Sequence, residues 1–173
     1  MAEAAARLSD VITLEPRFSE AYFLRSDFYV HTATMEGVAD GERAAAYRSY
    51  LADLTSAMEY ARSPGQRALI EVDRSLSGND WSRLPEHLEA ALSTRGCLQP
   101  VWVELAPIFG YASEALEFRR GMIECDPLNA LNYTTAAYHA LWQGEPDEAL
   151  SFATRGLEMA PDDPYLQGTE IEA

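Results

Sequence analysis

The chain has 173 residues, of which 47% are hydrophobic and 24% charged, so it can bury a core and does not have the composition of a disordered protein. It carries 28 acidic and 13 basic residues, and every basic residue is arginine. Because lysine is missing, a phosphate-loop lysine and Schiff-base chemistry are excluded. The net charge of −15 repels polyphosphates and argues against nucleic-acid binding.

Apolar residues recur at spacings of three and four along nearly the whole chain, a pattern typical of amphipathic helices. One short segment, 101–105, alternates as a strand does. We expect an all-α chain with helix ends placed to within about two to four residues. The expected helices cover residues 2–14, 19–35, 42–62, 66–77, 80–97, 101–109, 112–125, 129–143 and 146–160, and residues 164–168 begin a further helix.

Prolines end these helices at a recurring interval. The gaps between them are 48, 36, 27 and 34 residues, which places repeat ends near Pro16, Pro64, Pro100, Pro127 and Pro161. Twelve residues before these prolines stand Ala4, Ala52, Leu88, Ala115 and Ala149. A small side chain lets two helices of a hairpin cross closely, and the proline then stops the second helix. The interval therefore predicts a row of antiparallel helix hairpins.

Glycines mark the turns inside two of these hairpins. Gly110 and Gly144 each precede the crossing alanine by five residues. Glycine is favoured at a helix C-terminus because it adopts a left-handed backbone conformation without strain. We therefore expect one helix to end at each glycine, with a short turn before an acidic helix start.

Residues 130–161 resemble a tetratricopeptide repeat, a helix–turn–helix unit of about 34 residues. The residues that carry the resemblance are Tyr133 at the aromatic position, Ala137 at the small position, Gly144 at the turn, Ala149 and Ala153 at the helix crossing, and Pro161 at the end. Gly156 stands where the family has alanine, and Ala140 where it has tyrosine. Residues 18–29 resemble the first helix of another repeat, with Tyr22 as the aromatic residue and Ser26 as the small one.

This resemblance implies an antiparallel helix-hairpin superhelical solenoid of about four to five irregular repeats. Residues 1–173 would form a single repeat domain, as part of a longer protein or assembly. Segments 12–22, 79–92 and 125–130 also resemble tetratricopeptide arrays attached to bacterial signalling and transcriptional regulators.

Two segments depart from the regular interval. The first repeat is too long, and we place its surplus at residues 36–42 and in a lengthened second helix. The repeat that begins at residue 101 is too short and contains Pro107. We expect a local break over residues 101–111, with Trp102, Phe109 and Tyr111 filling the space.

Catalytic and metal-binding patterns are lacking, so we expect no enzyme, cofactor or metal site. His31, His87 and His139 lie on different expected helices, and we interpret each as a packed or solvated side chain. The spacing of Cys97 and Cys125 matches no metal or redox motif, which leaves a disulfide or two thiols. We favour thiols, because disulfides are rare in the cytoplasm, where the absence of a signal or membrane segment places the chain.

Recognition is the function that remains. By the resemblance, the groove that would face a partner is lined by Phe23, Asp27, Val30, His31, Thr134, Tyr138, Leu141 and Trp142. Trp142 and Tyr138 either anchor a partner or pack against the next helix. An acidic groove favours a basic or apolar protein segment. The alternatives are homo-oligomerisation through the ends of the solenoid, or a small-molecule site around residues 102–111.

Overall fold

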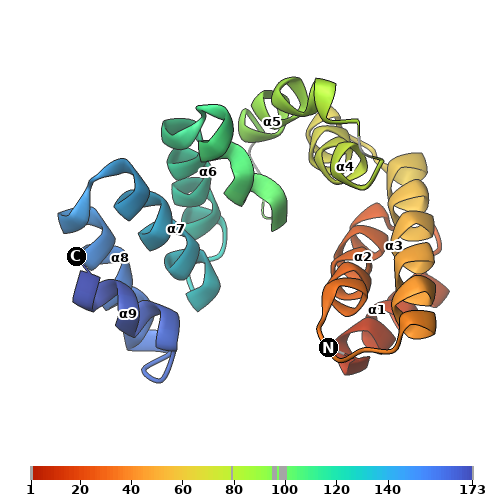
Figure 1. Cartoon of the computed structure of the whole chain (residues 1–173), viewed down its shortest axis with the longest axis horizontal. Helices are drawn as coiled ribbons and strands as arrows, with labels where there is room; N and C mark the ends of the chain where they lie inside the picture. Colours follow the sequence, from red (N-terminus) through yellow and green to blue (C-terminus); the bar gives the residue numbers. More distant parts are fainter. Residues whose placement is uncertain (1, 79, 95–96, 98–100, 173) are drawn as a thin grey trace. The chain divides into compact units, whose positions relative to one another are not determined.

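The computed structural model describes residues 2–78, 80–94, 97 and 101–172 (Figure 1). Every regular element within these ranges is a helix, and most of the helices pack against the next helix along the chain. The chain has two compact units, Met1–His87 and Leu88–Ala173. The predicted all-α helix-hairpin fold is confirmed, while a single domain spanning both units stays a prediction.

Unit 1 is built on the long hairpin of α2 (Ser19–Thr34) and α3 (Asp40–Tyr60). α1 (Ala2–Leu14) packs on α2, and α4 (Pro64–Ser77) packs on α3. The short 3-10 helix η1 (Trp81–Arg83) contacts α4. α2 and α3 bury Ala21, Phe23, Val30, Ala46, Tyr50, Leu54 and Ala57. The lengthened second helix expected of the first repeat is present as the 21-residue α3, which begins at Asp40, within the segment where the rest of the surplus was expected.

A buried ion pair joins the helices of unit 1. The guanidinium of Arg25 donates two hydrogen bonds to the carboxylate of Asp53. Its Nε lies 2.8 Å from one carboxylate oxygen and its Nη2 lies 2.7 Å from the other. Its Nη1 donates to the hydroxyl of Ser9 at 2.8 Å. One side chain thus connects α2 to both α3 and α1. Its hydrogen bond to Asp53 raises the pKa of Arg25 above the ordinary value.

Unit 2 is built around α7 (Ala130–Gln143), which contacts α6 (Ala112–Cys125), α8 (Pro146–Met159) and α9 (Pro164–Glu172). Its apolar interior holds the buried side chains of Leu116, Ile123, Tyr133, Ala136, Ala140, Ala149, Ala153 and Leu166. Gly156 lies where α8 approaches α9. A Cβ atom there would lie 2.7 Å from Leu166 and 3.1 Å from Tyr133. The resemblance predicts alanine at this position. The methyl group of an alanine would lie too close to these two side chains, which favours glycine.

The turns inside the hairpins follow the glycines. Gly144 has φ +77° and ends α7, donating its N–H to the carbonyls of Ala140 and Leu141. Gly110, at φ +91°, ends the 3-10 helix η2 (Val101–Phe109). The prediction that a helix ends at each of these glycines is confirmed. Glycine stands at both positions because other residues adopt such positive φ angles only with strain.

The short repeat is completed by a change of helix type. Residues 101–109 form the 3-10 helix η2, with Pro107 inside and Val103 and Ala106 fully buried. A 3-10 helix rises about 2.0 Å per residue against 1.5 Å in an α-helix, so a short segment spans more of the repeat's height. The expected break is confirmed, and the strand-like alternation of this segment is not a strand. Phe109 and Tyr111 are half-buried, whereas the side chain of Trp102 lies outside the described part.

Two sequence predictions in the middle of the chain are wrong. The helix expected over 80–97 is interrupted, since η1 precedes α5, which spans only Leu84–Leu92. Pro85 explains the late start, because proline is tolerated in the first turn of a helix and not in its interior. Ala52 is exposed rather than at a helix crossing. The lengthened α3 shifts the register, and Ala46 and Ala57 are buried in its place.

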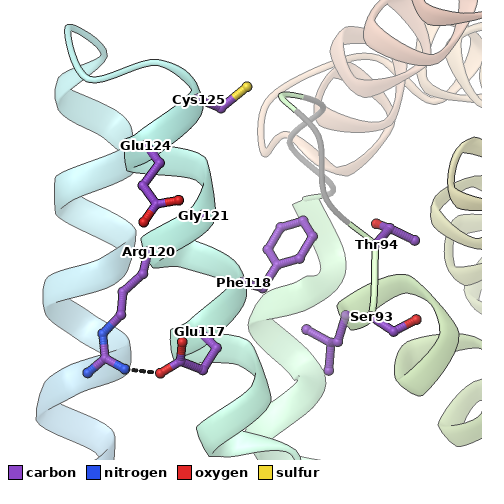
Figure 2. Close-up of a pocket in the computed structure, with 9 residues that line it drawn as sticks. Ser93, Thr94, Glu117, Phe118, Arg120, Gly121, Glu124 and Cys125 are labelled. Atoms are coloured by element: carbon purple, nitrogen blue, oxygen red, sulfur yellow. Dashed lines mark hydrogen bonds and ion pairs between the residues drawn. The ribbon is translucent and has the colours of Figure 1, made fainter.

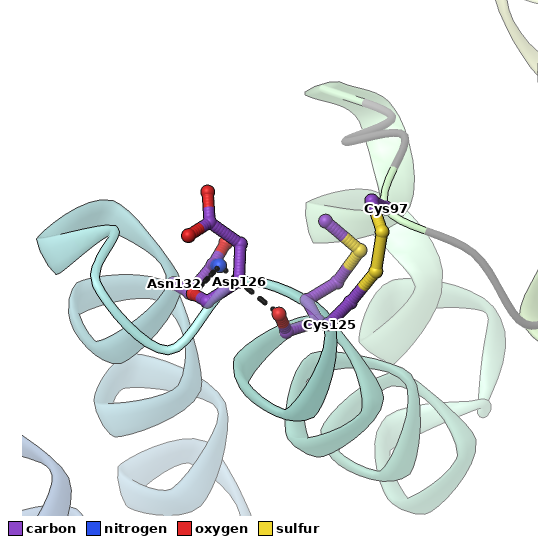
Figure 3. The surroundings of a disulfide bond; sticks show 5 residues. Cys97, Cys125, Asp126 and Asn132 are labelled. Carbon is purple, nitrogen blue, oxygen red and sulfur yellow. Dashed lines mark hydrogen bonds between the residues drawn. A yellow bond between two sulfur atoms is a disulfide. The ribbon is translucent and has the colours of Figure 1, made fainter.

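Cys97 and Cys125 form a disulfide, with their Cα atoms 5.5 Å apart (Figure 3). The prediction of two free thiols is therefore wrong, and both residues are exposed. Cys125 is the last residue of α6, and the end of this helix is tied to α7. The side-chain amide of Asn132 donates to the carbonyls of Met122 at 3.1 Å and Asp126 at 3.0 Å. The disulfide thus joins the segment before η2 to an anchored helix end.

Candidate functional site

The groove residues expected in unit 1 lie on α2 and differ in exposure. Phe23 and Val30 are buried in the core with α3, where their side chains do not reach the surface. Asp27 is half-buried and His31 exposed, with His31 Nδ1 3.3 Å from a carboxylate oxygen of Asp27. Burial raises the pKa of Asp27, and His31 partly opposes the rise. This set presents to solvent little more than one histidine–carboxylate pair.

The groove residues expected in unit 2 lie on α7 and are more accessible. Thr134 is buried and donates its hydroxyl to the carbonyl of Ala130 within the helix. Tyr138 and Leu141 are half-buried, and Trp142 is 57% exposed. The first predicted set thus lies in unit 1 and the second in unit 2.

An aromatic cluster forms where α7 meets α9. The ring of Tyr138 lies 6.4 Å from that of Trp142 and 6.5 Å from that of Tyr165. Tyr165 is 63% exposed, and Leu131, two turns before Tyr138 on the same side of α7, is 51% exposed. We call the surface of Leu131, Tyr138, Trp142 and Tyr165 the aromatic face. Sequence reasoning missed Tyr165, although its position at the start of an expected helix was the available signal.

A buried polar pair lies beneath this face. His139 is almost fully buried, and its ring packs edge-on against Trp142 at 5.2 Å. Neither of its ring nitrogens has a hydrogen-bond partner among the described residues. Burial, together with the nearby charge of Arg119, lowers the pKa of His139 to about 4. His139 is therefore neutral near pH 7 and supports one side of the Trp142 ring.

Arg119, on α6, is the other member of the pair. It is 2% exposed, and its Nη2 lies 3.5 Å from the carboxylate of Glu104 on η2. Burial lowers the pKa of Arg119, and Glu104 opposes that change. Sequence reasoning did not identify this pair, because nothing in the local pattern shows that η2, α6 and α7 converge.

Negative charge dominates unit 2. Residues 88–173 contain 14 acidic residues and four arginines. α7 has no aspartate, glutamate or arginine, and the charged residues of α9 are Glu170 and Glu172. The carboxylate of Asp163 caps α9 by accepting the N–H groups of Tyr165 and Leu166, at 2.9 and 3.1 Å. Beside the aromatic face, α7 thus contributes no aspartate, glutamate or arginine, and the described carboxylate of Asp163 lies at the start of α9.

A separate pocket of about 700 Å³ lies between the end of α5 and α6. Figure 2 shows Phe118 extending from α6 toward Ser93 and Thr94, with Glu117 and Glu124 along the same helix. Arg120 does not supply a free cation, because it pairs with Glu117 and Glu148. No lining residue comes from the described part of 102–111. The pocket therefore does not support a small-molecule site in that irregular segment.

The described ranges contain neither a candidate metal site nor a candidate membrane span. No three or more histidine, cysteine, aspartate or glutamate side chains there are placed to hold a metal ion. None of the described helices has the length and apolar character needed to cross a bilayer.

No protein-family model and no curated protein matches the chain. Among solved structures, it is similar to YrrB, described as "a TPR protein with an unusual peptide-binding site", at 16% identity and a TM-score of 0.49. That similarity covers 98% of this chain and 83% of the other. A TM-score this low supports no transfer of residues or binding properties.

The tetratricopeptide-like character of the chain rests on its own helices. Antiparallel pairs are joined at left-handed glycines, small residues fill the crossing of α7 and α8, and prolines mark the turns that follow α6 and α8. These are the features that the sequence resemblance predicts for the last repeat.

Proposed function

We propose that this chain is a protein-interaction module whose aromatic face binds a segment of a partner protein. The observation that carries the proposal is the cluster of Tyr138, Trp142 and Tyr165, in which two rings are more than half exposed. Aromatic side chains of this kind dominate binding energy at protein interfaces, because they bury a large area at a small cost in conformational entropy.

The cluster is also held in place before any partner arrives. His139 packs against one side of Trp142, and the ring of Tyr138 neighbours the rings of both Trp142 and Tyr165. All four residues stand on helices rather than on loops. A surface that is already ordered loses little entropy on binding, which favours affinity.

The character of the partner belongs to the same proposal. The acidic excess of residues 88–173 favours a basic or apolar segment over an acidic one. A role as the regulatory arm of a bacterial signalling protein follows from the resemblance alone. The cytoplasmic location also stays a prediction, and the exposed disulfide weighs against it because such bonds are typical of oxidising compartments.

A random 12-residue peptide library displayed on phage tests the proposal. We expect the wild-type chain to enrich peptides that no longer bind when Trp142 is replaced by alanine. Trp81→Ala is the matched control, because Trp81 is 51% exposed but lies in unit 1. Failure to enrich any peptide, or equal loss of binding in both variants, would overturn the proposed function.

A further inference from the structure

We propose that the rings of Trp142 and Tyr165 bind a cationic side chain, arginine or lysine, of the partner segment; this inference rests on the proposed function and specifies its chemistry. The faces of aromatic rings attract cations through their quadrupole, and tryptophan does so most strongly. Both rings are more than half exposed, so their faces are accessible to such a side chain.

Elsewhere in the chain, tyrosine rings and arginines are paired. The guanidinium-to-ring distances are between 5.3 and 5.9 Å for Arg17 with Tyr60, Arg25 with Tyr22 and with Tyr29, and Arg155 with Tyr133. All four distances fall within the range of about 6 Å in which cation–π attraction is significant. Covering of an aromatic ring by a guanidinium is therefore a recurring contact in this protein.

Trp142 and Tyr165 differ from these rings. Over the described ranges, no guanidinium lies within cation–π distance of either ring. The three arginines described in unit 2 have other contacts: Arg119 with Glu104, Arg120 with Glu117 and Glu148, and Arg155 with Tyr133. None of these three arginines therefore covers the ring of Trp142 or Tyr165, and we assign that place to a cation of the partner segment.

The local charge favours such a cation. Asp163 places a carboxylate at the start of α9, two residues before Tyr165, and the neighbouring Asp162 is exposed. α7 has no arginine. Its histidine, His139, is neutral near pH 7 because its pKa is about 4, so the helix carries no positive charge at that pH. A lysine or arginine approaching the rings thus meets attraction from the carboxylates and no competing cation on α7.

The experiment uses peptides enriched from the phage library by the wild-type chain. Each basic residue of a peptide is replaced in turn, arginine by citrulline and lysine by norleucine, and affinity is measured by isothermal titration calorimetry. At one position we expect affinity to fall about two- to thirty-fold, the range of a partly desolvated cation–π contact.

Variants of the full chain then locate that contact. Trp142→Phe and Tyr165→Phe keep a ring and should preserve the preference for arginine over citrulline. Trp142→Leu and Tyr165→Leu keep apolar area but should abolish the preference, with folding checked by circular dichroism. Enriched peptides that lack basic residues, or a preference that survives both leucine variants, would overturn the inference while leaving the proposed function standing. If no peptide is enriched at all, it is the proposed function that has failed.

Discussion

The hydroxyl of Tyr133 donates a hydrogen bond to the carbonyl of Pro127, 3.1 Å away and six residues earlier in the chain. Tyr22 makes the same bond to Pro16 at 3.1 Å in unit 1. Each bond ties the first helix of a hairpin to the turn before it, and thereby fixes the direction in which that helix begins. The aromatic position of the repeat therefore contributes a polar contact as well as buried area.

Removing this bond should cost stability in both units. Tyr133→Phe keeps the buried ring and loses only the hydroxyl, so we expect the free energy of unfolding to fall by about 0.5–1.5 kcal/mol. Tyr22→Phe should have a smaller effect, because its bond is exposed to water. Urea denaturation followed by circular dichroism measures both changes. Tyr165→Phe is the control, and a loss of stability in this exposed residue as large as that of Tyr133→Phe would contradict the assignment.

The ion pair of Arg25 and Asp53 should contribute far more to stability than an ion pair at the surface. Asp53 is 4% exposed, so Arg25→Met leaves a carboxylate buried without its cation. We expect the free energy of unfolding to fall by about 3 kcal/mol or more, as when other buried pairs are broken. Arg83→Met, which breaks an exposed pair with Glu86, is the comparison, and both variants are measured by thermal and urea unfolding. Similar small effects in the two would show that the buried pair does not hold α2 to α3.

Reduction of the disulfide should destabilise unit 2. A cross-link spanning 28 residues restricts the unfolded chain, and such a restriction is worth about 3.6 kcal/mol in the chain-entropy account. Cys97→Ser combined with Cys125→Ser should therefore unfold at a lower urea concentration than the oxidised wild type. Mass spectrometry with and without a reductant establishes the bond itself. If the reduced wild type is as stable as the oxidised protein, the bond does not stabilise the fold.

Acid should destabilise the chain through His139. The pKa of His139 is about 4 in the folded state and about 6.5 when unfolded, so the unfolded chain takes up a proton first as the pH falls. The stability that the folded state gains from a neutral His139 is complete above pH 6.5. As the pH falls from about 6.5 to 4 this stability is lost, and the free energy of unfolding decreases by up to about 3 kcal/mol.

Comparison of wild type with His139→Leu isolates this effect. Stability of the wild type should fall more steeply over that pH interval than stability of the variant. The raised pKa of Asp27 acts in the opposite direction in both proteins and cancels in the difference. Parallel curves for the two proteins would show that His139 is not held neutral by its surroundings.

Sequence reasoning identified the features that local chemistry determines. Gly144 ends α7 because only a left-handed residue closes that turn, and Pro127 and Pro161 lie in turns that follow helices. The resemblance placed Trp142 on the groove side and left open whether it packs against the next helix, and the structure has it more than half exposed. These are properties of a single hairpin, which the residues of that hairpin determine.

Contacts between hairpins were beyond that reasoning. The charge of Arg119 acts on His139 because α6 and α7 pack together, and Cys97 bonds to a cysteine 28 residues away. Phe23 and Val30 were assigned to a groove by position in the repeat, whereas the long α3 covers them. In each case a partner distant in sequence determines the outcome.

The most direct test of the central claim is fluorine NMR on the full chain labelled with 5-fluorotryptophan. The signal of Trp142, assigned with Trp142→Phe, is followed during titration with an enriched peptide. We expect it to shift in proportion to binding, while the signal of Trp81, in unit 1, stays in place. A Trp142 signal that is unmoved at saturation would contradict binding at the aromatic face.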